Sequence, residues 1–506
     1  MGHSEYGTVS GIPTPERRSV MSPIPRRNAL ILGGVGIAGV AVGGTGLVMN
    51  RGASTLGPSE VASGGELIEP TELRSANGSL SAALKSAAGQ VTIAGQTVRA
   101  LGYNGGTPGP TLRVQAGDTL SVSLHNALTD PSNLHVHGLH VSPEGNSDNM
   151  FVSVPAGDSF DYEYVLPANH PPGVYWYHPH LHGFVADQVF GGLFGAIIVE
   201  DPDPIPATRE RVLVISDITI GSAGTIPAAT SMEKMSGREG ELVLVNGQLN
   251  PGLTARPGER ERWRIVNTCV SRYLRLRLDG QRVTLLGIDS GRFASAREVD
   301  EIVLAPGNRA DVLVTGAAGT SALRTLRYDR GSMGGMMGGG SSSGADDIAL
   351  ATLTVAGETA PAAAEIPRQP VPRDLRATTV TARRELVFAM GMGGMGGGMM
   401  SATINGRAFD SSRVDETVQF GSVEEWLLTN TSPLDHPLHL HVWPMQIVEQ
   451  DGQAVEAATW QDVVNIPARS TTRVRIAFDD FSGKTVYHCH ILDHEDAGMM
   501  GIIQAR

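Results

Sequence analysis

Short segments in which apolar and polar residues alternate follow one another along most of this chain. Three early examples are residues 91–93, 111–114 and 119–125, each bounded by glycine or proline. Alternation with a period of two is typical of β-strands that bury one face. The 506 residues include 63 glycines and 30 prolines, which suits many short strands joined by turns. The pattern predicts an all-β protein, long enough for about three domains.

A weak internal repeat divides these strands into three sets. Each set opens with an Asn-Gly pair, and the three openings are residues 103–105, 245–247 and 404–406. The first and third sets also end alike, because Gly173 leads to Tyr-His-Pro-His and Gly483 leads to Tyr-His-Cys-His. The second set has no histidine at that place. We therefore predict three related β-sandwich domains, of which the middle one lacks metal ligands and acts as a spacer.

Changes in composition predict where these units begin and end. The stretch 54–69 is rich in glycine, serine and acidic residues, and the chain around 358–376 is rich in proline and alanine. The predicted organisation is a signal segment 1–53, a linker 54–69, domains at 70–203 and 204–360, a linker 361–382 and a third domain at 383–506. Two glycine-rich segments that carry methionines, 331–344 and 390–400, are predicted to be loops.

The N-terminal segment has the features of an export signal. Arg26 and Arg27 precede an uncharged, mildly apolar run from Ala29 to Met49. A twin-arginine pair before such a run is typical of proteins that cross the membrane already folded, through the twin-arginine export machinery. The predicted location is the periplasm, the cell envelope or the medium. The alternative is an uncleaved membrane anchor, because about 20 residues can just span a bilayer.

Charge and cysteine content narrow the class of protein further. The formal net charge is −13, which argues against nucleic acid as a partner. Only two cysteines are present, Cys269 and Cys489. Cys269 lies in an apolar stretch, and we expect a small buried side chain in a strand.

The surroundings of Cys489 carry the strongest chemical signal in the chain. Cys489 lies between two histidines, and His494 and Met499 follow it. One cysteine, two histidines and a weak axial methionine are the ligands of an electron-transfer copper site. The second histidine would come from the upstream run that begins at His436. In a strand Cys489 would point one way while His488 and His490 point the other, so this tripeptide would link two metal sites covalently.

Histidines also recur in pairs separated by one residue. The four pairs are His135/His137, His178/His180, His439/His441 and His488/His490. In a strand, each pair presents both imidazoles on one face, roughly 6–7 Å apart. If the first and third domains pack together, eight imidazoles converge, which suits a cluster of several copper ions. His140 and His182 exceed this set, and we interpret them as hydrogen-bond partners of the ligands or as structural residues.

Taken together, these motifs resemble the multicopper oxidase family, which includes laccases, ascorbate oxidase, bilirubin oxidase and bacterial cuprous oxidases. The resemblance runs from about Thr71 to the C-terminus, with one departure at Val442, where the family usually has glycine. It implies three cupredoxin-like Greek-key β-sandwich domains preceded by the export signal. It also implies four copper ions that couple one-electron oxidation of a donor to four-electron reduction of O2 to water.

The resemblance also implies a role for each residue that matches the family's motifs. The implied ligands are His436, Cys489, His494 and Met499 for a type 1 copper, His135 and His439 for a type 2 copper, and His137, His178, His180, His441, His488 and His490 for a type 3 pair. Asp148 resembles the family's acidic residue near the type 2 copper, and Glu495 resembles its proton-relay glutamate. The alternatives are an ordinary turn aspartate and a solvated loop acid.

The electron donor is the least determined part of the prediction. Eight of the 17 methionines fall in the two glycine-rich segments, and soft thioethers bind Cu(I) well. We therefore favour a cuprous oxidase that serves copper tolerance, with O2 and Cu(I) as partners. A laccase-like oxidase of phenols or aromatic amines is the first alternative. The second is an exported copper-storage protein with little turnover, although storage does not need the path through Cys489.

Overall fold

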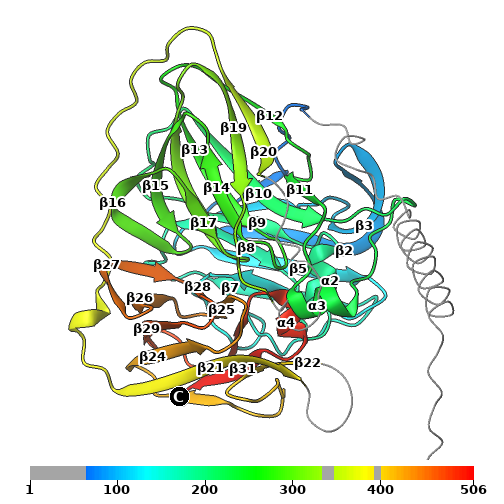
Figure 1. Ribbon diagram of the computed structural model, residues 1–506, viewed down its shortest axis with the longest axis vertical. Coiled ribbons are helices and arrows are strands. Elements are labelled where there is room, and N and C mark those ends of the chain that lie inside the picture. The colour runs from blue at the N-terminus through cyan, green and yellow to red at the C-terminus, as the bar shows by residue number, and fades with distance from the viewer. Residues whose placement is uncertain (1–63, 333–346, 393–399) are drawn as a thin grey trace, which may run out of the picture. The chain divides into compact units, whose positions relative to one another are not determined.

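The computed structural model describes residues 64–332, 347–392 and 400–506, and within these ranges the fold is built from six β-sheets. The sheets form three β-sandwiches, so the predicted all-β class is confirmed (Figure 1). The predicted signal segment 1–53 and most of the two methionine-rich segments lie outside the described residues. Among the helices of the described ranges, none is long and apolar enough to cross a membrane.

The first sandwich buries one core between two sheets. Alternating apolar side chains of both sheets, among them Leu84, Leu124 and Val136, are almost completely buried in that core. One sheet has the order β3-β2-β5-β7 and the other β1-β4-β9-β8-β6. The strands are β1 (Glu72–Arg74), β2 (Ser79–Ile93), β3 (Gln96–Tyr103), β4 (Thr111–Val114), β5 (Thr119–Ala127), β6 (His135–His137), β7 (Ser159–Val165), β8 (Gly173–His178) and β9 (Gly195–Val199).

The second sandwich repeats this plan with longer sheets. Its sheets have the orders β11-β10-β13-β18-β15-β16 and β12-β20-β19-β14-β17, and they share one apolar core. The strands are β10 (Arg209–Ile218), β11 (Leu242–Val245), β12 (Gly252–Ala255), β13 (Arg260–Asn267), β14 (Leu274–Leu278), β15 (Arg282–Ile288), β16 (Gly291–Val299), β17 (Ile302–Leu304), β18 (Arg309–Thr315), β19 (Gly319–Leu326) and β20 (Ile348–Val355).

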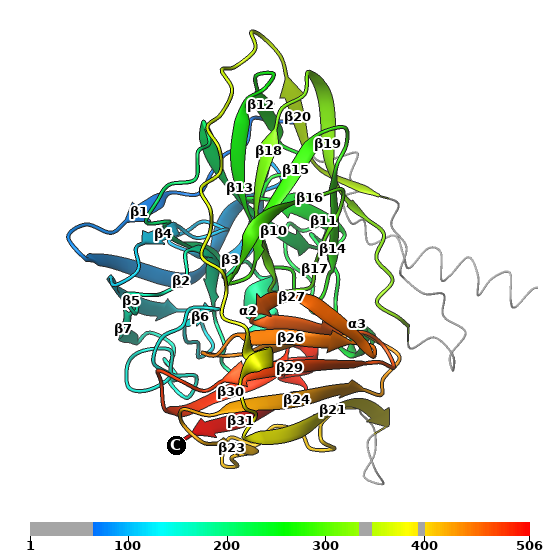
Figure 2. The same cartoon turned by 90° about the vertical axis from the view of Figure 1, so that its left-hand side faces the viewer.

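The third sandwich carries the C-terminal strands. Its sheets have the orders β22-β21-β24-β29-β26-β27 and β23-β31-β30-β25-β28, and Figure 2 shows β24, β29 and β26 side by side in the first of them. The strands are β21 (Ala382–Met392), β22 (Met400–Ile404), β23 (Glu416–Val418), β24 (Val423–Asn430), β25 (His436–Leu440), β26 (Met445–Gln450), β27 (Gln453–Gln461), β28 (Val463–Ile466), β29 (Thr471–Ala477), β30 (Gly483–Cys489) and β31 (Met500–Ala505).

The internal repeat seen in the sequence has a structural cause at its Asn-Gly pairs. Asn104, Asn246 and Asn405 all have φ between 52° and 54°, which asparagine adopts more readily than most residues. Each amide oxygen accepts a backbone N–H from an earlier strand at 2.8 Å. In each of the three repeats, a hairpin is therefore followed by the same turn with the same side-chain hydrogen bond. The parallel strand pairs β2–β5, β10–β13 and β21–β24 also recur, one in each repeat.

Three short helices and a single 3-10 turn complete the described structure: α2 (Val185–Phe190), α3 (Ser231–Ser236), α4 (Leu492–Asp496) and η2 (Leu375–Ala377). Helix α4 follows Cys489 and joins all three sandwiches through its acidic residues. Asp493 accepts hydrogen bonds from Arg238 in the chain after α3, and Asp496 accepts the backbone N–H groups of Gly183, just before α2, and of Ala186 in its first turn. These contacts hold α4 in place at the junction.

Two details differ from the sequence prediction. Cys269 is buried as expected, but it lies two residues beyond the end of β13, where Asn267 accepts its backbone N–H, so the strand assignment was wrong. Part of the predicted linker 54–69 packs on the second sandwich, because Leu67 joins that core and donates its N–H to Gly252. The boundaries between the domains stay predictions.

Candidate metal centre

The residues predicted for the type 1 copper meet at the end of β30. Cys489 closes that strand, His436 opens the neighbouring β25 and His494 lies in α4. Nδ1 of His436 is 3.4 Å from the Cys489 sulfur, and Nδ1 of His494 is 3.9 Å from it. Met499 is completely buried, and its carbonyl accepts the N–H of Cys489. The group His436, Cys489 and His494 could hold one metal ion.

The outer nitrogens of both histidines are already bonded, which leaves Nδ1 of each for a metal. Nε2 of His436 lies 2.8 Å from the hydroxyl of Ser432, which itself donates to the carbonyl of Leu434. Nε2 of His494 donates to the carbonyl of Met235 in α3 at 3.0 Å. Burial raises the pKa of the Cys489 thiol, so a metal cation is needed to hold it as a thiolate. Two imidazoles and one thiolate suit copper.

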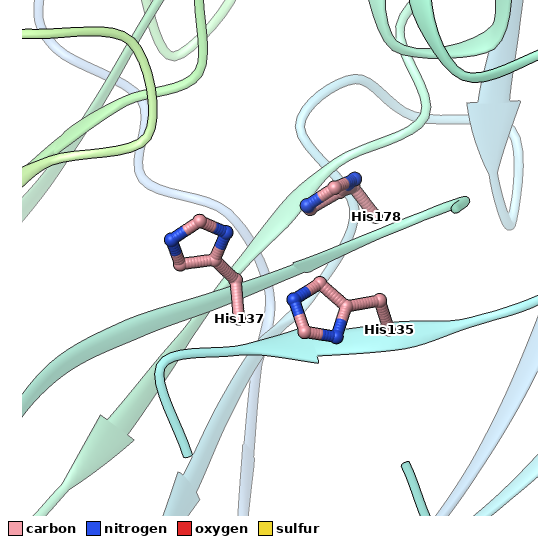
Figure 3. A group of neighbouring side chains, drawn as sticks. All are labelled: His135, His137 and His178. Carbon is pink, nitrogen blue, oxygen red and sulfur yellow. The ribbon is translucent and has the colours of Figure 1, made fainter. Parts of the chain in front are cut away.

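The eight remaining histidines converge from two sandwiches. Strands β6 and β8 bring His135 opposite His178, and strands β25 and β30 bring His439 opposite His488. All eight side chains are at most 2% exposed. Figure 3 shows the imidazoles of His135, His137 and His178 turned toward a common space. The eight are His135, His137, His178, His180, His439, His441, His488 and His490.

Distances between ring nitrogens and between ring centroids relate these eight side chains in three subsets. Nε2 of His135 and Nε2 of His439 face each other at 3.4 Å. Nε2 of His488 lies 3.0 Å from Nε2 of His180 and 3.2 Å from Nε2 of His441. The rings of the third subset lie 4.9–5.9 Å apart between centroids: His137, His178 and His490. These subsets overlap, because His135 also lies close enough to His137 and His178 to share a metal ion with them.

Several ring nitrogens of these histidines have no hydrogen-bond partner. They include Nε2 of His178 and both ring nitrogens of His490. A buried polar atom without a partner costs about 1–3 kcal/mol, and a metal ion would remove that cost. Burial is the largest effect that lowers the pKa of His135, His137 and His178, and neighbouring imidazoles lower it further. The imidazoles are neutral at pH 7, as metal ligands must be.

Both predicted acid–base residues lie beside this cluster. The Asp148 carboxylate accepts Nδ1–H of His135 at 2.9 and 3.0 Å and the N–H of Val136 at 3.1 Å. Burial raises the pKa of Asp148 to about 8, against the lowering effect of the Val136 N–H. An Oε2 of Glu495 lies 3.0 Å from Nδ1 of His488. Burial raises the pKa of Glu495 to about 7. Both carboxyl groups are at most 1% exposed, so neither is a solvated loop acid.

The surplus histidines lie outside the cluster. His140 donates from Nδ1 to the carbonyl of Val442 at 2.8 Å, and its Nε2 lies 3.0 Å from Asp480. His182 packs its ring 4.7 Å from that of Phe409. Val442, the departure from the family pattern, has φ of 70°. This conformation costs a residue other than glycine about 1–2 kcal/mol, which explains why glycine is usual there.

Sequence reasoning missed three residues around the proposed ligands, of which two contact a ligand directly. Asp462, just before β28, lies 3.1 Å from Nε2 of His137, and its carbonyl accepts Nδ1–H of His439. Arg309 of the second sandwich pairs with Asp462, and Met235 of the same sandwich bonds His494. The middle domain therefore places residues beside the proposed ligands. The only signal in the sequence was one acid, Asp462, immediately before the apolar pair Val463 and Val464.

Comparison with known proteins is informative at this point. Family models described as multicopper oxidase match residues 85–204, 210–323 and 379–506. The chain is 27% identical over 416 residues to the multicopper oxidase mco of Staphylococcus haemolyticus, covering 80% of this chain and 83% of that protein.

Solved structures give the same result for the fold. A multicopper oxidase of Campylobacter jejuni, described as a metallo-oxidase, superposes with a TM-score of 0.78 at 29% identity over 89% of this chain and 97% of that one. The laccase-like multicopper oxidase CueO of Ochrobactrum sp., with oxidase activity towards lignin model compounds, has a TM-score of 0.74 at 26% identity over 87% of this chain and 100% of that one.

Proposed function

Because the chain belongs to the multicopper oxidase family, we propose that it is a cuprous oxidase of copper tolerance, which oxidises Cu(I) and reduces O2 to water. The observation that carries the choice of donor is the hydrogen bond from Nε2 of His494 to the carbonyl of Met235. It places α3, which also carries the exposed Met232, against the outer edge of a proposed copper ligand.

We propose four copper ions in the two groups of side chains. The type 1 ligands are His436, Cys489, His494 and Met499; the type 2 ligands are His135 and His439; the type 3 ligands are His137, His178, His180, His441, His488 and His490. The unpartnered nitrogens and the burial of these side chains support this assignment. Bound copper would supply one-electron acceptance at the first group and reduction of O2 at the second.

The chain itself connects the two groups. Cys489 belongs to the type 1 set, while its neighbours His488 and His490 belong to the other, so a single tripeptide joins them covalently. In β30 the side chains of Cys489 and His488 point to opposite faces of the sheet. This geometry gives electrons a short path through bonds. Copper storage would need no such path, which argues against the storage alternative.

Protons come to the site through its carboxyl groups. Reduction of O2 to water consumes four protons for every four electrons, so groups that hold a proton near neutral pH are required. Asp148 would hold one at the His135 side of the cluster, and Glu495 would hold one at the His488 and His180 side. Their burial keeps bulk water away and raises both pKa values toward the working pH.

Helix α3 supports Cu(I) as the donor. Met232 is 58% exposed and Met235 is partly buried, so two thioethers lie on the helix that covers His494. Thioethers are soft ligands and favour Cu(I). The description of the Campylobacter jejuni protein as a metallo-oxidase agrees with this choice, whereas the Ochrobactrum protein favours the laccase-like alternative. The two methionine-rich segments would add further Cu(I) ligands, although they lie mostly outside the described residues.

The protein would work outside the cytoplasm. The twin-arginine pair at Arg26 and Arg27 supports export in the folded, copper-loaded state. An uncleaved segment 1–53 would instead anchor the protein to the membrane. Replacement of both arginines by lysine should retain the copper-loaded protein in the cytoplasm, as cell fractionation would show.

The donor is tested by oxygen consumption of the copper-loaded protein with stabilised Cu(I) or with a phenol. Replacing Met232 and Met235 together by leucine keeps their size and removes the thioethers. We expect KM for Cu(I) to rise about tenfold, equivalent to ~1.4 kcal/mol of binding, with little effect on phenol oxidation. The matched control is Met150→Leu, which alters a buried methionine of the first sandwich.

Three outcomes would contradict the proposal in different ways. Inert Cu(I) with rapid phenol oxidation would identify a laccase. No oxygen uptake with either donor, despite full copper loading, would identify a storage protein. An unchanged KM for Cu(I) in the double variant would remove α3 from donor binding; the same measurement after methionine-to-leucine replacement in segments 331–344 and 390–400 would then test those segments.

A further inference from the structure

A buried arginine of the second sandwich lies at the point where all three sandwiches meet. Arg309, the first residue of β18, is completely buried. Its guanidinium donates to both carboxylate oxygens of Asp462 in the third sandwich, at 2.5 and 2.7 Å, and to the carbonyl of Val174 in the first at 2.9 Å. A bidentate arginine–carboxylate pair fixes the position of the carboxylate and stabilises its negative charge.

The residue that Arg309 holds is the one that contacts the proposed copper ligands. Oδ1 of Asp462 is 3.1 Å from Nε2 of His137, and the Asp462 carbonyl accepts Nδ1–H of His439 at 2.8 Å. His137 comes from the first sandwich and His439 from the third. With Nε2 of His137 bonded to the carboxylate, its Nδ1 has no partner and is the nitrogen left for a metal.

The backbone of Asp462 is held from the same side. Asp289 of the second sandwich accepts the N–H groups of Asp462 and Val463 at 3.2 and 3.1 Å, and it also accepts the backbone N–H of Arg309. Asn308 donates to both oxygens of Asp289 and to the carbonyl of Val463. Side chain and main chain of Asp462 are therefore both fixed by the second sandwich.

Two glycines allow this close approach. A Cβ on Gly138, the residue after His137, would lie 2.8 Å from the Asp462 carboxylate and closer still to the Arg309 guanidinium. A Cβ on Gly307, two residues before Arg309, would lie 2.9 Å from the ring of His490. The loop that leads into β18 thus packs directly against a third proposed ligand.

We propose that Arg309 and Asp289 are positioning residues of the trinuclear copper site: they hold Asp462 so that it sets the ring orientation and tautomer of His137 and His439. The inference rests on the ligand assignment proposed above. In metal sites generally, the group that bonds a ligand's other nitrogen controls orientation, and its loss lowers affinity or activity about 10- to 100-fold. The second sandwich, which supplies no ligand of its own, would then be a working part of the site.

A purely structural role is the competing explanation, because a buried ion pair at an interface is costly to break whatever lies beside it. A matched control separates the two. Arg264, on the adjacent strand β13, is also completely buried, and among the described residues its ion-pair partners are Asp201, Glu210 and Asp311. Arg264→Lys thus perturbs an equally buried pair away from the proposed ligands.

The test uses the copper-loaded full chain and the variants Arg309→Lys, Asp462→Asn and Arg264→Lys. The readouts are copper content, the blue absorbance of the type 1 copper and the electron paramagnetic resonance spectrum of the type 2 copper. We expect Arg309→Lys and Asp462→Asn to keep the blue absorbance but to change the type 2 hyperfine splitting, with type 2 occupancy or oxygen turnover about 10- to 100-fold lower. Arg264→Lys should leave the type 2 spectrum unchanged.

An unchanged type 2 spectrum and copper content in both test variants would overturn the proposal. The proposal would also fail if Arg264→Lys lowered type 2 occupancy or oxygen turnover as much as the two test variants do. If Arg309→Lys and Asp462→Asn do not fold, Asp289→Asn decides, because Asp289 contacts Asp462 directly only at a backbone N–H and otherwise acts through Val463 and Arg309. Failure of the ligand assignment itself would appear separately, as the absence of a type 2 signal from the unsubstituted protein.

Discussion

A hydrogen bond at one ring nitrogen orients four histidines of the cluster: His135, His137, His178 and His439. Nδ1 of His135 donates to Asp148, Nδ1 of His178 to the carbonyl of Pro179, and Nδ1 of His439 to the carbonyl of Asp462. His137 is reversed, because its Nε2 is the bonded nitrogen. These partners select one neutral tautomer for each ring before any metal binds, which lowers the cost of assembling the site.

A substitution at Asp148 tests whether the hydrogen-bond partner of one histidine affects turnover. We expect Asp148→Asn to keep the blue absorbance, because Asp148 contacts none of the type 1 ligands, and to lower oxygen turnover about 10- to 100-fold. The amide has no ionisable proton and presents only one oxygen to His135. Oxygen uptake and absorbance of the same copper-loaded sample are the measurements.

The control for Asp148→Asn is Asp158→Asn, an exposed acid of the same sandwich. It should leave both the absorbance and the turnover unchanged. Turnover in Asp148→Asn equal to that of the unsubstituted protein would remove Asp148 from the proton supply.

Helix α3 is the element that covers the proposed point of electron entry. It has only six residues, and none of them is fully buried. Side-chain packing therefore contributes little to the stability of this helix, and its N-terminal cap contributes much. Thr230 accepts the N–H of Glu233 at 3.2 Å, and the Glu233 side chain accepts the N–H of Thr230 at 2.7 Å. This capping box is worth about 0.5–2 kcal/mol, a large share of the stability of so short a helix.

Loosening α3 should change which donors reach His494. We expect Thr230→Ala to raise kcat/KM for a bulky phenol several-fold and to lower it for Cu(I), because the helix that carries Met232 and Met235 would open more often. Steady-state oxygen uptake with each donor measures this. Thr320→Ala, at an exposed position of β19, is the control. Equal changes for both donors would show that α3 does not select between them.

Buried ion pairs connect neighbouring sandwiches across the molecule. They fix the relative position of the sandwiches more specifically than apolar contacts alone would. Asp201, at the end of the first sandwich, and Asp311, in β18 of the second, share three arginines within 3.4 Å: Arg262, Arg264 and Arg292. Burial alone would raise the pKa of Asp311, but the three guanidinium groups outweigh it and hold the pKa well below its ordinary value.

This shift predicts how stability depends on pH. A depressed folded-state pKa stabilises the fold above the unfolded value of about 3.9 and ceases to do so as pH falls through the folded value. We expect Asp311→Asn to lower the free energy of unfolding by about 3 kcal/mol at pH 7, because it leaves buried arginines with less counter-charge. The difference in the free energy of unfolding between Asp311→Asn and the unsubstituted protein should become steadily smaller below about pH 4.

Denaturant titrations at several pH values measure this difference. Asp279→Asn is the control, since Asp279 pairs with Arg277 and Arg324 near the surface, where an ion pair contributes about 0–1 kcal/mol. A difference for Asp311→Asn that stays constant down to pH 2 would contradict the assigned shift.

The class of fold and the set of candidate ligands follow from local patterns in the sequence. Alternating strands and three Asn-Gly turns are local patterns, and each turn closes through contacts within about 20–30 residues. The four His-x-His pairs and Cys489 are equally local, although only the pair His135/His137 lies within one strand and the second histidine of each other pair follows the end of its strand. Ten of the twelve predicted ligands fall in groups of side chains that could hold a metal ion, while the roles of the individual residues stay predictions.

How those ligands are held depends on contacts between residues far apart in the chain. Asp462 meets His137 across 325 positions of the chain, Arg309 meets Asp462 across 153, and Met235 meets His494 across 259. No periodicity connects residues so far apart, since their contact depends on how separate sandwiches pack. The lone acid at Asp462 and the short helix α3 therefore appeared unremarkable in the sequence. Their roles arise from the junction of three domains, which exists only once the whole chain has folded.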